Sequence, residues 1–287
     1  MSQQPLAYLD PAFLESDEGR PVRILAEYLD PLKRFKDQRI QDTVVFFGSA
    51  RVDSRERAER SLQMLRARGE RAPDDHYETE LKKSRKAVEW ARFYEEAREL
   101  ARLLASWTTS LQSENQRFVI TSGGGPGIME AANRGAREGG GKTIGLNIRL
   151  PFEQGANPYI TDGLHFEFHY FFMRKFWFAY LAKALVVFPG GFGTLDEMFE
   201  ILTLAQTDKL SKKIGVVLYG SEYWKQVLDL KPMADWGAIA DKDLELLHYA
   251  DTPADAFTYL RDHLIANHLE PHTPQEAATP GIAKTRG

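Results

Sequence analysis

The sequence predicts a single Rossmann-like α/β domain, with a doubly wound parallel sheet flanked by helices. Three observations predict this fold class. Short apolar runs that fit buried strands alternate with segments of helical periodicity. The runs are apolar at successive positions, as is typical of strands covered on both faces. Two of these runs end in glycine clusters that open helices, as strand-to-helix turns of nucleotide-binding sheets do.

Length and composition agree with one large cytoplasmic domain. The chain has 287 residues, 43% of them hydrophobic, and a net charge of −4. This charge gives no reason to expect nucleic acid or a membrane as a partner. The absence of cysteine excludes disulfides, thiolate zinc sites and cysteine nucleophiles. Residues 1–10 lack the basic start and apolar core of a signal peptide, and no apolar run approaches the about 20 residues of a membrane span.

The predicted elements follow one another at short spacing. Strands are expected at residues 43–47, 118–121, 143–147, 164–168, 184–188 and 214–219. Helices are expected at 21–29, 87–107, 128–138, 171–183 and 195–207, and two or three helical segments from 225 to 268.

Three regions follow from this pattern. Residues 41–268 are expected to form the nucleotide-binding domain, with a charged surface insertion at 53–85. Residues 1–40 are polar and contain several prolines, so they read as an N-terminal extension. Residues 269–287 are rich in Pro, Ala and Thr and are expected to be a disordered tail.

Three turns are predicted to face one crevice. The first strand runs into Gly48-Ser49, the second into the cluster 123–127, and the fifth into the cluster 190–193. In an open parallel sheet, ligands bind at the carboxyl ends of the strands. Glycine lets backbone N–H groups approach an anion closely, and the first turn of a helix adds free donors. A tight turn would explain one such cluster alone, but two clusters at one crevice favour a phosphate site.

Two other phosphate motifs do not fit. Gly141-Lys142-Thr143 mimics the end of a Walker A loop, but its first glycine position is Ala136, and the lysine enters a strand. Gly191-Phe192-Gly193 begins like a dinucleotide fingerprint, but the third glycine position is Asp196. Neither an ATPase nor an NAD enzyme is favoured.

Four motifs together resemble a known family. The run 189–197, Pro-Gly-Gly-Phe-Gly-Thr-Leu-Asp-Glu, is similar to the PGGxGTxxE signature of the LOG family of cytokinin-activating phosphoribohydrolases, long labelled possible lysine decarboxylases. Its other motifs are resembled by Gly48-Ser49-Ala50, by the glycine turn 123–130 and by Met173-Arg174-Lys175, which contains the arginine-lysine pair. All four motifs occur in the order that the family has. Phe171-Phe172 before the arginine is similar to the longer bacterial branch. The resemblance spans residues 43 to about 219.

The resemblance implies an activity and a site. The activity is cleavage of the N-glycosidic bond of a nucleoside 5′-monophosphate, such as AMP or a cytokinin nucleotide, to the free base and ribose 5-phosphate. No cofactor and no metal are implied, and a homodimer or higher homo-oligomer is. The implied site residues are the catalytic pair Arg174 and Glu197, the phosphate-binding Gly190, Gly191, Gly193 and Thr194, and the nucleotide-binding Ser49, Gly124, Gly125, Met173 and Lys175.

This chemistry suits the residues. Breaking a ribosyl C–N bond develops positive charge on the sugar, which a carboxylate beside the ribose stabilises. Glu197 follows the phosphate turn by one helical turn, and Arg174 suits the phosphate or the leaving base. Taken alone, Glu197 would be an acid that complements the helix dipole, and Arg174 a solvated helix charge. Their joint spacing in the motif favours the catalytic interpretation.

Two other functions remain as alternatives. A non-catalytic nucleotide or molybdenum-cofactor carrier has similar glycine turns, but retention of Arg174 and Glu197 disfavours it. Amino-acid decarboxylation would need pyridoxal phosphate on a lysine such as Lys175 or Lys183, whose sequence setting marks neither. His165 and His169 lack a third metal ligand nearby, so a metal site is not favoured.

Overall fold

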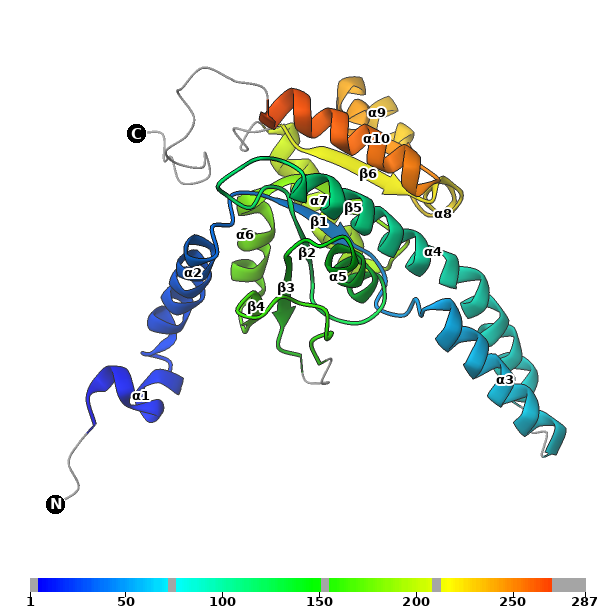
Figure 1. The fold of residues 1–287 in the computed structure, drawn as a ribbon, viewed down its shortest axis with the longest axis horizontal. Helices are drawn as coiled ribbons and strands as arrows, with labels where there is room; N and C mark the ends of the chain where they lie inside the picture. The colour runs from blue at the N-terminus through cyan, green and yellow to red at the C-terminus, as the bar shows by residue number, and fades with distance from the viewer. Residues whose placement is uncertain (1–4, 72–75, 151–154, 208–212, 270–287) are drawn as a thin grey trace.

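A parallel sheet forms the centre of the molecule (Figure 1). The computed structural model describes residues 5–71, 76–150, 155–207 and 213–269. Within these residues the strands lie in the order β4-β3-β2-β1-β5-β6-β7, and every neighbouring pair is parallel. Their bounds are β1 Thr43–Phe47, β2 Val119–Ser122, β3 Thr143–Ile148, β4 His165–Phe168, β5 Ala182–Val187, β6 Gly215–Tyr219 and β7 Leu247–Ala250. The predicted doubly wound parallel sheet is confirmed.

Helices cover both faces of this sheet. Their bounds are α1 Pro11–Glu15, α2 Arg20–Asp37, α3 Arg55–Arg71, α4 Tyr77–Thr109, α5 Ile128–Glu138, α6 Phe171–Leu181, α7 Phe192–Gln206, α8 Ser221–Val227, α9 Lys231–Asp235 and α10 Pro253–Leu264. Short 3-10 helices occupy Ala7–Leu9 and Asp241–Leu246, and a π-helical turn follows at Ile265–Leu269. Among the described residues, none of the helices combines the length and the apolar composition that crossing a bilayer requires.

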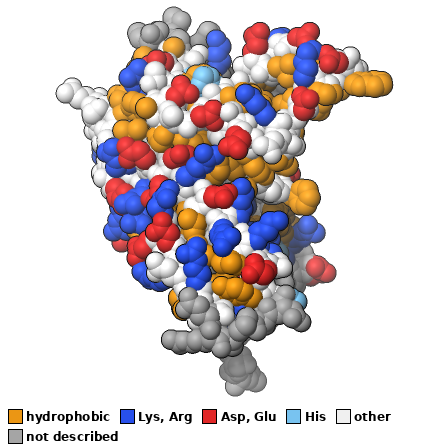
Figure 2. All heavy atoms as spheres, turned by 90° about the vertical axis from the view of Figure 1, so that its right-hand side faces the viewer, with side chains coloured by type: hydrophobic (Ala, Val, Ile, Leu, Met, Phe, Trp, Pro, Cys, Tyr) orange, Lys and Arg blue, Asp and Glu red, His pale blue; other side chains and the backbone are white. Residues whose placement is uncertain are grey.

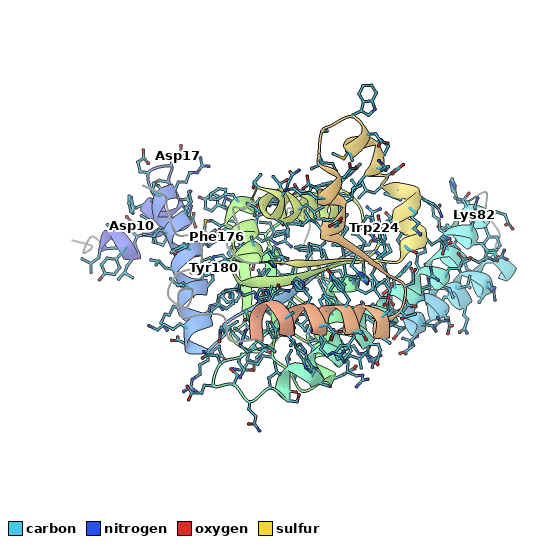
Figure 3. The ribbon with its side chains drawn as sticks, turned by 90° about the horizontal axis from the view of Figure 1, so that it is seen from above. Asp10, Asp17, Lys82, Phe176, Tyr180 and Trp224 are labelled. Carbon is cyan, nitrogen blue, oxygen red and sulfur yellow. The ribbon has the colours of Figure 1, made fainter. Side chains whose placement is uncertain are left out.

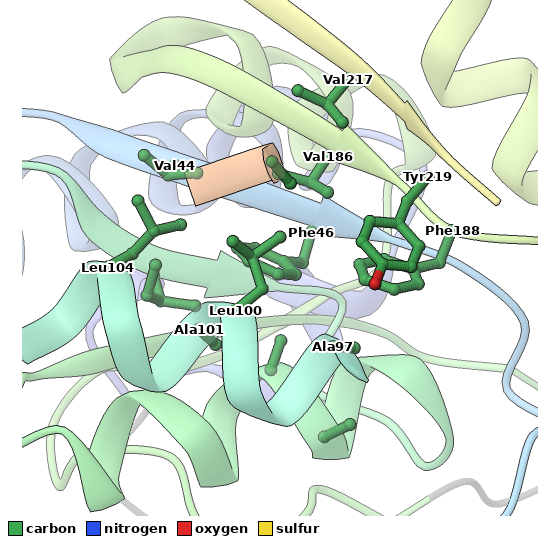
Figure 4. Close-up of a cluster of buried hydrophobic side chains, with 14 of the residues drawn as sticks. Val44, Phe46, Ala97, Leu100, Ala101, Leu104, Val186, Phe188, Val217 and Tyr219 are labelled. Carbon is green, nitrogen blue, oxygen red and sulfur yellow. The ribbon is translucent and has the colours of Figure 1, made fainter. Parts of the chain in front are cut away.

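One face packs against α4, α5 and α10 (Figure 4). There Leu100 and Leu104 of α4 meet Val44, Phe46 and Val186 of the central strands, and all five are fully buried. The recurrence of apolar residues at three- and four-residue spacing, which predicted this helix, is what places them on one side.

The other face packs against α2, α6, α7 and α8. The indole N–H of Trp177 in α6 donates to the Glu27 carbonyl of α2 at 2.9 Å, and the rings of Phe35 and Trp177 lie 5.3 Å apart. Figure 3 shows Phe176 and Tyr180 of α6 beside α2. The N-terminal segment therefore supplies part of the core of this face.

Two helical segments project from opposite ends of the molecule (Figures 1 and 3). At one end lie α1 and α2. At the other, α3 and the first half of α4 form an antiparallel arm, and α4 has 33 residues, or about 50 Å of helix. Figure 2 shows basic and acidic side chains interspersed on the face at the arm's end.

Some boundaries differ from those predicted. The helix expected from residue 87 begins at Tyr77, so most of the described part of the expected insertion is helical. The prediction of helices alone after residue 225 is wrong, because β7 adds an edge strand at Leu247–Ala250. This strand has only four residues and is buried at one of them, so it has no apolar run to reveal it. The predicted tail, 269–287, lies almost wholly outside the described residues.

Candidate active site

The strand order reverses between β1 and β5, and the edge of the sheet at the carboxyl ends of these strands is called the crevice below. From β1 the chain winds outward through β2, β3 and β4, and then returns to β5 on the other side of β1. Such a reversal of strand order is where open α/β sheets bind ligands, outside the carboxyl ends of the strands. The turns after β1 and β5 lie at this point, and the turn after β2 lies beside them.

Backbone hydrogen bonds join the three turns. The Ser49 N–H donates to the Pro189 carbonyl at 3.0 Å, and the Ile128 N–H donates to the Ser49 carbonyl at 3.2 Å. Gly127 has φ +71° and packs against the backbone of Ser49 and Ala50. A Cβ on Gly127 would lie 2.4 Å from the Ser49 carbonyl oxygen, so only glycine fits. The predicted convergence of the turns is confirmed.

The turn after β5 is open where an anion would bind. A Cβ on Gly191 or Gly193 would meet no atom within 4 Å, so backbone there is accessible. Gly190 is buried and lies against the side chain of Thr194, and its carbonyl accepts from the Tyr223 hydroxyl at 2.7 Å. Helix α7 begins at Phe192, so the N–H groups of its first turn have no carbonyl four residues back. The turn can therefore hold a phosphate at a helix N-terminus.

The turn after β2 is held by buried side chains. The Gly124 N–H donates to the Ser122 hydroxyl at 3.0 Å, and the Asn157 side-chain amide donates to the carbonyls of Gly124 and Gly125, each at 3.1 Å. The same amide donates to Asn133 Oδ1 at 2.9 Å. Gly124 has φ +73°, which favours glycine.

Arg174 lies between the turn after β2 and helix α7. Helix α6 presents its guanidinium, whose Nε donates to the Leu146 carbonyl at 2.7 Å and which lies 5.1 Å from the centre of the Phe178 ring. A Cβ on Gly123 would lie 2.6 Å from an Arg174 amino nitrogen, so only glycine leaves room for the guanidinium there. Burial lowers the pKa of Arg174, although the nearby Glu197 raises it.

Glu197 meets Arg174 from the opposite helix. Its Oε1 lies 3.9 Å from an Arg174 amino nitrogen, and the two side chains are 9% and 14% exposed. Burial raises the pKa of Glu197 to about 7, against the lowering effect of Arg174 and Lys175. A carboxyl group of this pKa exists in both protonation states near neutral pH, which suits general acid–base work.

Lys175 lies beside this pair but is engaged elsewhere. Its ammonium lies 2.8 Å from Asp196 Oδ2 and 3.0 Å from Glu200 Oε2, both on α7. Burial lowers the pKa of Lys175, but these two hydrogen bonds outweigh it and leave the pKa raised. Lys175 therefore neutralises acids of α7 in this structure.

Of the remaining predicted site residues, three lie at the crevice and one packs in the core. The backbone of Ser49, Gly124 and Gly125 lies at the crevice. Met173 is 7% exposed and packs in the core formed with α2 and α6, so its side chain serves packing.

Sequence reasoning missed the asparagines. Asn147, Asn157 and Asn133 are all buried at or behind the turn after β2. A polar residue at the end of an otherwise apolar predicted strand, as Asn147 is, was the available signal.

Comparison with known proteins finds similarity to one family over part of the chain. Residues 129–260 match the family described as "Possible lysine decarboxylase". The chain is 26% identical over 146 residues to the probable cytokinin riboside 5'-monophosphate phosphoribohydrolase LOG6 of Arabidopsis thaliana, a match that covers 51% of this chain and 72% of the relative. The cytokinin riboside 5'-monophosphate phosphoribohydrolase LOG of Oryza sativa subsp. japonica is 25% identical over 152 residues, 51% of this chain and 60% of the relative.

A bacterial relative and solved structures extend the comparison. The cytokinin riboside 5'-monophosphate phosphoribohydrolase of Rhodococcoides fascians is 30% identical over 112 residues, 38% of this chain and 55% of the relative. The chain thus spans less than two thirds of the rice and Rhodococcoides proteins. The Moco carrier protein from Chlamydomonas reinhardtii is 20% identical, with a TM-score of 0.45, over 79% of this chain and 99% of that chain. Residues 129–260 are thus similar to the family described as "Possible lysine decarboxylase", in keeping with the resemblance of the glycine motifs to the LOG family.

Proposed function

We propose that this protein hydrolyses the N-glycosidic bond of nucleoside 5′-monophosphates, with AMP or a cytokinin nucleotide as substrate. The observation that carries the proposal is the meeting of the largely buried Arg174 and the buried Glu197, 3.9 Å apart, at the crevice where the three turns converge. The relatives named as phosphoribohydrolases support it.

In this proposal, different residues bind the phosphate, the ribose and the base of the substrate. The open backbone at Gly191 and Gly193 and the first turn of α7 hold the 5′-phosphate. Glu197 lies one helical turn further along α7, so the ribose attached to that phosphate comes beside its carboxyl group. Arg174 faces Glu197 and lies where it can bind the phosphate or the departing base.

The reaction adds the elements of water across the bond. As the bond between C1′ and the base nitrogen breaks, its electron pair leaves with the base, and positive charge develops on the ribose. Ionised Glu197 stabilises this charge and accepts a proton from the water whose oxygen bonds to C1′. The departing base takes one proton from solvent, Glu197 returns the proton it accepted to solvent, and ribose 5-phosphate keeps the hydroxyl, so one water is consumed for each bond broken.

The direct test is product analysis. The purified protein is incubated with AMP and with isopentenyl-AMP, and the free base is measured by chromatography together with ribose 5-phosphate. Equal molar release of both products supports the proposal. Tight binding of nucleotide without release would instead identify a carrier, the alternative in keeping with the molybdenum-cofactor protein named above. Loss of carbon dioxide from lysine would identify a decarboxylase.

A further inference from the structure

Asn147 is a buried residue whose side-chain carbonyl oxygen has no hydrogen-bond partner among the described residues. It is the last residue but one of β3, is 7% exposed, and its Oδ1 atom is buried. The side chain lies against Gly124, so closely that a Cβ on Gly124 would overlap it. An unpaired buried amide oxygen is costly, and native proteins keep such groups where function uses them.

The two neighbouring buried asparagines differ from Asn147, because their side chains are hydrogen bonded. Asn157 and Asn133, behind the same turn, have their side chains hydrogen bonded to backbone or to other side chains. Asn147 is the next residue after Leu146, whose carbonyl accepts from Arg174. Its side chain therefore belongs to the candidate site, but the turn does not need it for its own hydrogen bonds.

The sheet fixes how far Asn147 lies from the phosphate turn. That turn follows β5, and the strands β1, β2 and β3 succeed it in order. Neighbouring strands are about 4.8 Å apart, so the ends of β5 and β3 are separated by about 14 Å. A nucleotide lying along this edge, with its phosphate at the end of β5 and its ribose at Glu197, directs its base toward β3.

We propose that Asn147 recognises the base of the substrate and selects 6-aminopurines over 6-oxopurines; this rests on the proposed function. An asparagine amide offers one acceptor and two donors. That set pairs with the N6 amino group and ring nitrogen N7 of adenine, whereas O6 and N7 of a 6-oxopurine are both acceptors. A substituent on N6 leaves one N–H, so cytokinin nucleotides keep the donor.

The side chain can present this pair with little change. The terminal torsion of asparagine is soft, so the amide plane turns about its last bond without moving the backbone of β3. The carbonyl then exchanges its contact with Gly124 for a hydrogen bond from the base.

The test compares AMP with IMP, which differ at position 6 of the base. For the wild type we expect kcat/KM for AMP to exceed that for IMP by about tenfold or more. Asn147→Ala should bring the ratio close to one, with unchanged inhibition by ribose 5-phosphate. Asn147→Asp, which keeps the volume and the acceptor but not the donor, should lower kcat/KM for AMP yet retain the preference over IMP.

Asn157→Ala is the matched control. It loosens the turn after β2, so it should lower kcat/KM for both nucleotides by a similar factor. A wild type that does not discriminate, or an Asn147→Ala variant that discriminates as the wild type does, overturns the inference.

Binding measurements separate this outcome from failure of the proposed function. If no nucleotide is hydrolysed, the proposed reaction is wrong, but calorimetric dissociation constants for AMP and IMP still test Asn147. Loss of the AMP preference in Asn147→Ala supports base recognition in that case, and an unchanged ratio contradicts it.

Discussion

Glu197 is a buried acid whose environment changes its pKa. The side chain is 9% exposed, and burial raises the pKa of its carboxyl group to about 7. Its sequence position in the first turn of a helix would equally suit an acid that stabilises the helix dipole. Such an acid gains by remaining ionised in solvent, and Glu197 instead lies inside, 3.9 Å from Arg174. This burial beside a cation supports the proposed catalytic role rather than a role in stabilising the helix dipole.

Replacing Glu197 should separate catalysis from binding. We expect Glu197→Gln to lower kcat for AMP by about 100-fold or more, the usual contribution of a general acid–base group. The dissociation constant for AMP should change little, because the lost interaction forms in the transition state. Chromatographic rates and calorimetry on the same preparations measure both. Glu200→Gln is the control, and a comparable loss of binding in Glu197→Gln would mark the residue as structural.

The ion pairs of Lys175 could not be predicted from the sequence motif. The arginine-lysine pair of the family motif predicts two nucleotide-binding cations, but the Lys175 ammonium is held by Asp196 and Glu200. Side-chain direction on α6 decides this, and adjacent residues on a helix face different ways.

We expect Lys175→Met to change the pH dependence of the reaction more than its affinity. Lys175 lowers the pKa of Glu197, while Asp196 and Glu200 raise it. Without the lysine, the pKa of Glu197 should rise further above 7, so the pH at which kcat reaches half its plateau moves upward by roughly one unit or less. Rate measurements from pH 5 to 9 test this. A large rise in KM with an unmoved midpoint would instead assign Lys175 to the phosphate.

The positions of the glycine turns were predictable from the sequence, but which of their glycines are open to a ligand was not. The clusters and the strands before them follow from sequence alone, because apolar runs and glycines have local causes. Which glycine is open to a ligand and which is covered depends on neighbours distant in the chain. Gly124 faces Asn147, whereas Gly193 faces open space. The edge strand β7, with four residues and one buried side chain, has no local signal at all.

Two glycine-to-alanine substitutions should therefore behave oppositely. Gly124→Ala places a Cβ against Asn147 at φ +73°, so we expect a lowered Tm and weak activity. Gly193→Ala meets no atom, so Tm should stay within about 1 °C of the wild type while the affinity for ribose 5-phosphate falls several-fold. Calorimetry and thermal unfolding of both variants decide the matter. Unchanged affinity in Gly193→Ala would move the phosphate to another turn.

The molecule as a whole is less compact than its sequence pattern predicts. The charged segment expected as a surface excursion is the arm of α3 and α4, which continues a core helix outward (Figure 3). The Arg57 guanidinium of this arm donates to the buried Glu130 at 3.2 Å, in the first turn of α5. Alternating charges alone do not distinguish such a helix from a loop, because the arm has little apolar surface to bury. The core, by contrast, was predictable from its strands.

The raised pKa of Glu197 should make the stability of the whole protein depend on pH. A carboxyl group whose folded-state pKa is raised contributes stability below its unfolded pKa, and this is lost as pH rises through the folded value. For Glu197 the window runs from about 4.5 to about 7. Glu197→Gln removes the ionisation, so we expect the variant to match the wild type near pH 4.5 and to exceed it by about 3 kcal/mol above pH 7.5. Urea unfolding of both proteins across this range measures the gap. A gap that is constant with pH would show that the folded protein does not hold this carboxyl group in its uncharged form, and would remove the physical basis for its role near neutral pH.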